Sequence, residues 1–366
     1  MYFGVKMNTQ YSAATSAERI ILKCRELYGK YGYRRFLMSK FEDYDLYAGN
    51  KSFLTSDAVL TFTDRSGKLK ALKPDVTLSI VKNLGEDESL PVKVFYNENV
   101  YRPNDGGKEF SEIMQLGLES LGADDIYSTA EVIALAEMSL RNISDEHILD
   151  ISHMGLISAV TDAAGMDASG KKALTDAICR RSTDGVKKLL GEGELTDNIC
   201  KLLFEYQPLT DALPMIKAML PECEAIAELE GICAILVSLG LDGRVFLDFS
   251  LINDMSYYNG IIFRGFVSGI PSAVLSGGRY DPLLQRFGRD IGACGFAIYL
   301  DKLASFEKQN DADIDVLLIY GENDDPAKVA TKVGELINEG KRVLAAKSRP
   351  DGIKFSETVE FTEVNE

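Results

Sequence analysis

Residues 113–122 read IMQLGLESLG, a run in which leucines alternate with polar or small residues. Alternation with a period of two is typical of a β-strand, so Gln115, Gly117 and Glu119 are predicted to share one face while the leucines take the other. An amide, a gap and a carboxylate along one face would form the wall of a pocket. The stretch by itself leaves a second interpretation open, in which these residues are the solvent-exposed polar face of an antiparallel sheet.

A second candidate site lies in the stretch ALKPDVT, residues 71–77. Asp75 and Thr77 stand just past a proline, where a helix is predicted to start, and residues of these types cap helices. The Asp75 carboxylate is equally suited to hold the ammonium group of a ligand. The sequence alone does not choose between the two roles.

Two stretches nearer the C-terminus contain adjacent aromatic residues and adjacent glycines. Tyr257 and Tyr258 stand together in SYYNGIIF, and on a strand they would point to opposite faces, with at least one in the core. Gly277 and Gly278 stand in SGGRYD. They indicate either a tight turn or a strand position where a ligand or another backbone approaches closely.

Working outward from these stretches, strand patterns and helix patterns occur in separate blocks. We predict an α+β fold, in which an antiparallel sheet flanked by helices is built from residues 1–155 and 241–310. Residues 156–240 have a helical pattern almost throughout and are predicted to form an insertion. Residues 311–366 are predicted to form a small C-terminal βαβ unit.

Composition and charge narrow the function classes. The 366 residues include 56 acidic and 40 basic side chains, and a formal charge of -16 repels nucleic-acid phosphates. We therefore expect no nucleic-acid partner. The sequence has neither a signal-peptide pattern nor an apolar run of the ~20 residues that span a bilayer, so a cytoplasmic protein without membrane contact is expected.

The ligands that zinc prefers are scattered along the chain. Six cysteines occur without a CxxC pair, and His147 and His153 are the only histidines. Because a zinc site needs clustered ligands, we predict no metal site and no cofactor. We interpret the two histidines as a surface position and a strand or cap position, and not as a catalytic base.

Five stretches in this order resemble the catalytic core of histidyl-tRNA synthetases, a class II aminoacyl-tRNA synthetase fold, over about residues 10 to 305. They are ALKPDVT, VYRPNDGGKEFSEIMQLGLE, SYYNGIIF, SGGRYD and GFAIYLDKL. The resemblance implies that Asp75 and Thr77 hold the α-amino group of histidine and that Gln115 and Glu119 contact the amino acid and its imidazole. It implies that the tyrosine pair closes over the ring. With these residues we place Arg102, Gly277 and Gly278 in the predicted histidine site.

The sequence departs from the synthetase pattern where ATP chemistry is carried out. Residues 253–256 read NDMS where the synthetases read Arg-Gly-Leu-Asp, so Asn253 replaces an arginine. Lys302 stands where the family has another arginine, and Pro103 and Asn104 replace a histidine and a glutamate. Arg102 remains. Because adenylation depends on cations that stabilise charge on phosphorus, aminoacylation is predicted to be absent.

A chain that retains the histidine site and lacks the ATP arginines resembles the regulatory subunits of ATP phosphoribosyltransferase. This resemblance implies a non-catalytic subunit, required with a short catalytic subunit for the first step of L-histidine biosynthesis and subject to feedback by histidine. It also implies a homodimer within a hetero-oligomer. A histidyl-tRNA synthetase and a free-standing histidine-binding paralog are the alternatives that the sequence leaves open.

Overall fold

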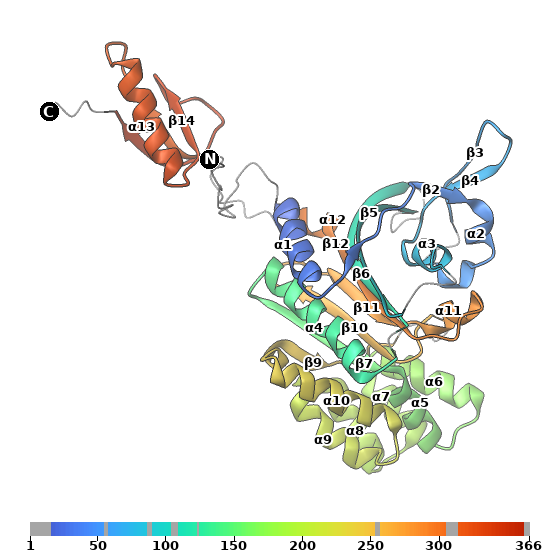
Figure 1. The fold of residues 1–366 in the computed structure, drawn as a ribbon. Helices are drawn as coiled ribbons and strands as arrows, with labels where there is room; N and C mark the ends of the chain where they lie inside the picture. Colours follow the sequence, from blue (N-terminus) through green and yellow to red (C-terminus); the bar gives the residue numbers. More distant parts are fainter. Residues whose placement is uncertain are drawn as a thin grey trace. The chain divides into compact units, whose positions relative to one another are not determined.

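The computed structural model describes residues 16–54, 58–85, 90–103, 109–122, 124–252, 257–304 and 314–361. The chain divides into a large compact unit, Ile20–Ser305, and a small unit that holds the remaining residues. Figure 1 shows the elements of both. The candidate site lies wholly in the large unit.

The large unit is built on a sheet of nine described strands in the order β1-β5-β6-β12-β11-β10-β7-β9-β8. Neighbouring strands are antiparallel except for the pairs β1–β5 and β7–β9, which are parallel. The strands are β1 Arg34–Arg35, β5 Val92–Pro103, β6 Phe110–Leu121, β7 His147–His153, β8 Gln207–Pro208, β9 Val245–Leu247, β10 Ile261–Val267, β11 Leu275–Arg279 and β12 Ala293–Tyr299. The predicted α+β fold with an antiparallel sheet flanked by helices is confirmed.

Two helices cover one face of this sheet, as Figure 1 shows: α1 (Ser16–Lys30) and α4 (Ile126–Ile143). The Tyr28 hydroxyl of α1 lies 2.9 Å from Ser139 Oγ of α4, which ties the helices together. The Tyr28 ring packs against Phe95 and Phe296, with centroids 5.9 and 6.2 Å apart. This face is therefore filled by helices, and the opposite face is left for the site.

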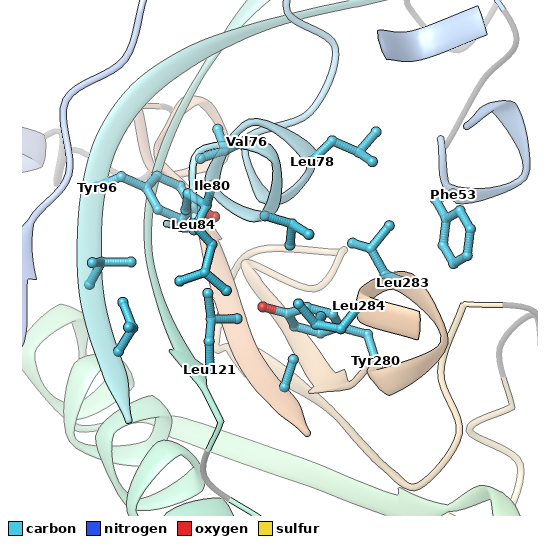
Figure 2. Packing of buried hydrophobic residues seen from close by; sticks show 14 of the residues in the cluster. Phe53, Val76, Leu78, Ile80, Leu84, Tyr96, Leu121, Tyr280, Leu283 and Leu284 are labelled. Carbon is cyan, nitrogen blue, oxygen red and sulfur yellow. The ribbon is translucent and has the colours of Figure 1, made fainter. Parts of the chain in front are cut away.

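Smaller elements lie over the opposite face. They are α2 (Tyr44–Ala48), the 3₁₀ turn η1 (Lys51–Phe53), α3 (Thr77–Lys82), α11 (Asp281–Arg286) and the sheet β2-β4-β3 (Phe41–Asp43, Leu69–Leu72, Thr61–Thr63). Their apolar side chains form one buried cluster with those of the large sheet. Figure 2 shows the α3 residues Leu78 and Ile80 between Tyr96 of β5 and Leu283 of α11. This packing fixes the first turn of α3 above the sheet.

Between β7 and β9 the chain is helical, with only the two-residue strand β8 among the helices. The insertion contains α5 Met154–Ala163, α6 Ala168–Cys179, α7 Thr183–Leu190, α8 Glu194–Phe204, α9 Leu209–Met219, α10 Glu224–Ser238 and the 3₁₀ turn η2 Asp242–Arg244. His153 caps α5 by accepting a hydrogen bond from the Gly155 amide. His147 is buried on β7, with Nε2 3.2 Å from Glu137, so its expected surface position was wrong. No local pattern in the sequence indicates that the buried carboxylate of Glu137 accompanies it.

The small unit contains the predicted βαβ motif and one further strand. β13 (Ile314–Ile319) and β14 (Val343–Ala346) are parallel and are joined through α13 (Pro326–Asn338). β15 (Phe355–Glu360), which the sequence did not predict, pairs in parallel with the other edge of β13. The domain boundaries proposed from the sequence stay a prediction.

No helix in the described ranges is long and apolar enough to cross a bilayer. Among the same residues, no group of three or more histidine, cysteine and acidic side chains is placed to hold a metal ion.

Candidate functional site

A cavity of about 450 Å³ lies on the face of the large sheet that α1 and α4 leave open. Seven of the nine predicted site residues line it: Asp75, Thr77, Arg102, Gln115, Glu119, Tyr257 and Tyr258. The other lining residues are Phe53, Leu54, Tyr96, Arg264, Ser276, Tyr280, Gly295, Phe296, Ala297 and Tyr299. Segments far apart in the chain thus meet around one volume.

The floor of the cavity comes from β6 and its neighbour β12. Gln115 pairs with Tyr299 and Glu119 pairs with Gly295, so these side chains share one face as the alternation predicted. Gln115 is 3% exposed and Glu119 is 2% exposed. The second interpretation, a solvent-exposed polar face, was therefore wrong.

Gly295 is the position that gives Glu119 its room. A Cβ atom at residue 295 would stand 1.7 Å from Glu119 Oε2 and 2.5 Å from the Leu118 carbonyl oxygen. Any other residue at 295 would require the carboxylate to leave its present place. The glycine in the stretch GFAIYLDKL is thus a steric requirement of the site.

The Glu119 carboxylate is held by two hydroxyl groups. Thr77 Oγ1 donates to Oε1 at 2.8 Å and the Tyr280 hydroxyl donates to Oε2 at 2.5 Å. Both donors are neutral, and burial raises the pKa of Glu119 to about 8 against these two hydrogen bonds, with the nearby Asp75 charge adding to the increase. The cavity therefore contains a carboxyl group that a cationic ligand would convert to its charged form.

Asp75 performs the capping role and also lines the cavity. Its Oδ1 accepts a hydrogen bond from the Leu78 amide at 2.9 Å, and Oδ2 lies 3.4 Å from Arg102 Nη2. Burial raises the pKa of Asp75, while the Arg102 charge opposes the increase. Arg102 Nε donates to the Pro74 carbonyl at 2.7 Å, so this arginine fixes the loop that carries Asp75.

A buried ion pair between Lys73 and Glu98 of β5 anchors the same loop to the large sheet. Lys73 is fully buried, and its Nζ lies 2.5 Å from Glu98 Oε2. The Lys73 carbonyl accepts a hydrogen bond from the Tyr101 amide at 2.9 Å. Because breaking a buried pair leaves an unpaired charge, this contact holds the segment before Asp75 in one place.

Aromatic rings form the roof. Tyr257 packs on Tyr258 with centroids 4.5 Å apart, and on Phe53 and Tyr280 at 5.9 and 6.1 Å. Both tyrosines line the cavity, so the expectation that they point to opposite faces of a strand was wrong. The pair lies before β10 and outside any strand. The next residue, Asn259, donates a hydrogen bond from its side chain to Asp281 and from its amide to the Arg279 carbonyl.

Gly277 and Gly278 lie inside strand β11 and do not line the cavity. A Cβ at Gly277 would stand 2.4 Å from the Gly295 carbonyl oxygen, which shows a close approach of backbone. A Cβ at Gly278 would stand 2.7 Å from the Tyr258 ring. Of the two sequence interpretations, the close approach inside a strand is confirmed. The absence of a side chain at Gly278 leaves room for the Tyr258 ring to pack against the sheet.

The positions that depart from the synthetase pattern are only partly visible. Asn253 to Ser256 and Asn104 lie outside the described residues. Pro103 ends β5 opposite Phe110. Lys302 Nζ donates to the Ala273 carbonyl at 2.8 Å and lies 4.8 Å from the centre of the Tyr299 ring.

Sequence reasoning missed Tyr280, Arg264 and Ser276. Tyr280 stands in SGGRYD, two residues after the glycine pair, so its place in a family stretch was the signal that could have found it. Arg264 lies inside the apolar run IIFRGF of β10, where a charged residue on a central strand indicates a polar or ligand-facing environment.

Comparison with known proteins adds family relationships. The family described as histidyl-tRNA synthetase matches residues 9–303. An ATP phosphoribosyltransferase regulatory subunit from Clostridium kluyveri is 31% identical over 317 residues, which cover 81% of this chain and 80% of the relative. One from Thermoanaerobacter sp. is 32% identical over 318 residues, which cover 82% of each chain.

Solved structures share the fold. An ATP phosphoribosyltransferase regulatory subunit/histidyl-tRNA synthetase from Bacillus halodurans aligns with a TM-score of 0.72 at 22% identity, covering 98% of this chain and 97% of that one. The ATP phosphoribosyl transferase complex of Thermotoga maritima contains a chain that aligns with a TM-score of 0.62 at 20% identity, covering 78% and 97%. The chain therefore belongs to the family of ATP phosphoribosyltransferase regulatory subunits, which is built on the class II fold of histidyl-tRNA synthetase.

Proposed function

We propose that the chain binds free L-histidine in the cavity and acts as the histidine-sensing regulatory subunit of ATP phosphoribosyltransferase. The observation that carries the proposal is the Glu119 carboxyl group, buried between the hydroxyls of Thr77 and Tyr280 with a pKa raised to about 8. When the imidazole ring of a ligand accepts the proton of this carboxyl group, the two form an ion pair, and no proton is exchanged with the solvent. Histidine is the amino acid with such a ring.

The remaining polar groups fit the rest of the amino acid. Asp75 lies in the loop just before α3 and Thr77 is the first residue of α3, and we assign both to the α-ammonium group. The aromatic roof of Tyr257 and Tyr258 covers the imidazole. The polar groups that this ligand needs are thus gathered around one volume.

Aminoacylation is not part of the proposed function. Arg102 is engaged with Pro74 and Asp75, and Lys302 is engaged with Ala273 and Tyr299. The sequence supplies no arginine at 253 or 302, so charge on an adenylate phosphorus lacks the two arginines that the synthetases place at these positions. A histidyl-tRNA synthetase is the alternative function, and an ATP–pyrophosphate exchange assay with histidine tests it directly. Label exchange by the purified chain would overturn the proposal.

The partner in this proposal is the short catalytic subunit of ATP phosphoribosyltransferase, with the chain as a homodimer in the hetero-oligomer. The complex from Thermotoga maritima supports the pairing by its fold. Feedback requires histidine to bind two conformations of the complex unequally, since equal affinities shift no equilibrium. We assign the switch to the roof that carries Tyr257 and Tyr258.

Reconstitution of the complex tests the assignment of the switch. Tyr258→Phe should weaken inhibition by histidine while the activation of the catalytic subunit without histidine stays at the parent level. Phosphoribosyl-ATP formation is measured against histidine concentration. Identical inhibition curves for the variant and the parent would remove Tyr258 from the switch.

Calorimetry with free histidine tests the site itself. Glu119→Ala should cost about 1.5 to 3 kcal/mol of binding free energy, the range for a hydrogen bond with a charged partner. Glu112→Ala is the matched control, because Glu112 lies on the same strand but is exposed and hydrogen-bonds to Asn99 and Tyr101 outside the cavity. Unchanged histidine affinity in Glu119→Ala would refute the placement of the imidazole.

A further inference from the structure

The cavity is lined by two arginines, which differ in the hydrogen bonds that they make with the rest of the protein. Arg102 donates to the Pro74 carbonyl at 2.7 Å and pairs with Asp75 at 3.4 Å. Arg264, on β10, makes no hydrogen bond and no ion pair within 4 Å with any residue that the structure describes. It is therefore the cation of the cavity that is uncommitted to the described protein groups.

Arg264 stands on the same sheet face as the Glu119 wall. Gly117 pairs with Ala297, Ala297 with Ser276, and Ser276 with Arg264, so the four positions form one row across β6, β12, β11 and β10. Glu119 lies two residues further along β6 and thus on the same face. Three strand spacings and two residue steps separate the Cα atoms of Glu119 and Arg264 by about 16 Å.

Small residues leave the space between these two side chains open. Ala297 and Ser276 line the cavity between β6 and β10. Arg264 lines the same cavity as Glu119, on the far side of these two residues. A ligand with a cationic ring at one end and an anionic group at the other fits between Glu119 and Arg264.

The acidic neighbour of Arg264 is engaged elsewhere. Asp150 is its partner on β7, and the Tyr206 hydroxyl donates to the Asp150 carboxylate. Arg181 pairs at 2.9 Å with the adjacent Asp248. Asp150 contributes a favourable field to the guanidinium, but its hydrogen bond is made with Tyr206.

We propose that Arg264 anchors the carboxylate of the bound amino acid. The inference rests on the proposed histidine site and assigns to it a specificity residue that the family resemblance did not indicate. The guanidinium donates two parallel N–H groups to a carboxylate, which a neutral hydroxyl of the ligand cannot match. The site thereby selects the amino acid over its reduced or decarboxylated analogues.

The experiment compares three ligands on three proteins by calorimetry. The ligands are L-histidine, L-histidinol, in which a hydroxymethyl group replaces the carboxylate, and histamine, which lacks it. The proteins are the parent chain, Arg264→Gln and the control Arg65→Gln. Arg65 is exposed in the turn between β3 and β4. The parent and the control should bind histidine about 10- to 100-fold more tightly than histidinol. In Arg264→Gln that ratio should fall to within about twofold of unity.

The ratio of two ligands is insensitive to the fraction of protein that is folded, so partial unfolding of the variant does not mimic the result. If the parent binds histidine and Arg264→Gln keeps the full preference over histidinol, the assignment of Arg264 is wrong and the histidine site stands. If the parent binds neither histidine nor its analogues, the histidine site and the assignment of Arg264 both fall. Arg264→Lys adds a positive control, since it keeps the charge and should keep part of the preference.

Discussion

Glu119 and Asp150 lie on the same face of the large sheet, near its two ends, and each receives a tyrosine hydroxyl. Tyr280 donates to Glu119 and Tyr206 donates to Asp150. Burial raises both pKa values, to about 8 for Glu119 and to about 6 for Asp150. The fold therefore presents two versions of one arrangement, a buried acid under a tyrosine.

What differs is the charge nearby. The Asp248 charge adds to the effect of burial on the pKa of Asp150, while the Arg181 and Arg264 charges lower this pKa. The charged neighbour that affects Glu119 is Asp75, which raises its pKa further. Asp150 thus has arginines close by, whereas the charged neighbour of Glu119 is another acid, which suits Glu119 to a ligand that brings a cation.

The largest expected effect is on the pH dependence of stability. A raised carboxyl pKa means that the folded chain binds more protons than the unfolded chain between the ordinary and the raised pKa, so stability falls as pH rises through that window. The parent should lose stability relative to Glu119→Gln from pH 4.5 to about 8. Relative to Asp150→Asn it should lose stability only from pH 3.8 to about 6. Denaturant unfolding at a series of pH values measures both windows, and windows of equal width would contradict the comparison.

A smaller effect is expected from filling the space beside Glu119. Gly295→Ala should destabilise the large unit by about 1 to 3 kcal/mol and weaken histidine binding, because the added Cβ overlaps the carboxylate. Gly29→Ala in α1 is the control, since a Cβ there meets no atom within 4 Å and should stabilise by up to about 1 kcal/mol. Thermal unfolding and calorimetry give the two quantities. Full histidine affinity in Gly295→Ala would show that Glu119 does not need its present position.

The smallest effects come from deleting each tyrosine hydroxyl. Tyr280→Phe should raise the pKa of Glu119 further, since the lost hydrogen bond favours the charged form. Tyr206→Phe should raise the pKa of Asp150 in the same way and leave histidine affinity unchanged. The upper limit of each stability window reports the shift. A change in histidine affinity on Tyr206→Phe would mean that the two ends of the sheet are coupled.

The floor of the site could be predicted from the sequence because strand alternation is a local property. Gln115 and Glu119 stand four residues apart on one strand, an even number, so their shared face follows from backbone geometry alone. The roof is different. Tyr280 reaches Glu119 across 161 residues of chain, and no local pattern encodes such a contact. The family resemblance supplied the tyrosine pair, but it did not indicate that both rings line the cavity.

The same limit explains the smaller errors. β15 reads FSETVE, in which no residue is buried, so its pairing with β13 comes from backbone hydrogen bonds and not from an apolar face. His147 follows the polar residues 144–146, yet it is buried together with Glu137 from the preceding helix. In both cases tertiary contacts decided what the residues themselves left open.

The pairing of β6 with β12 has a consequence for how the chain folds. β5 and β6 are joined by a short connection and can pair early, whereas Glu119 and Gly295 are neighbours that stand far apart in sequence. Closing so long a loop costs conformational entropy before any contact rewards it, and pairings of this kind form slowly. The floor of the cavity is formed by these two late-pairing strands, β6 and β12. The ability to bind a ligand should therefore be among the last properties that a newly made chain acquires.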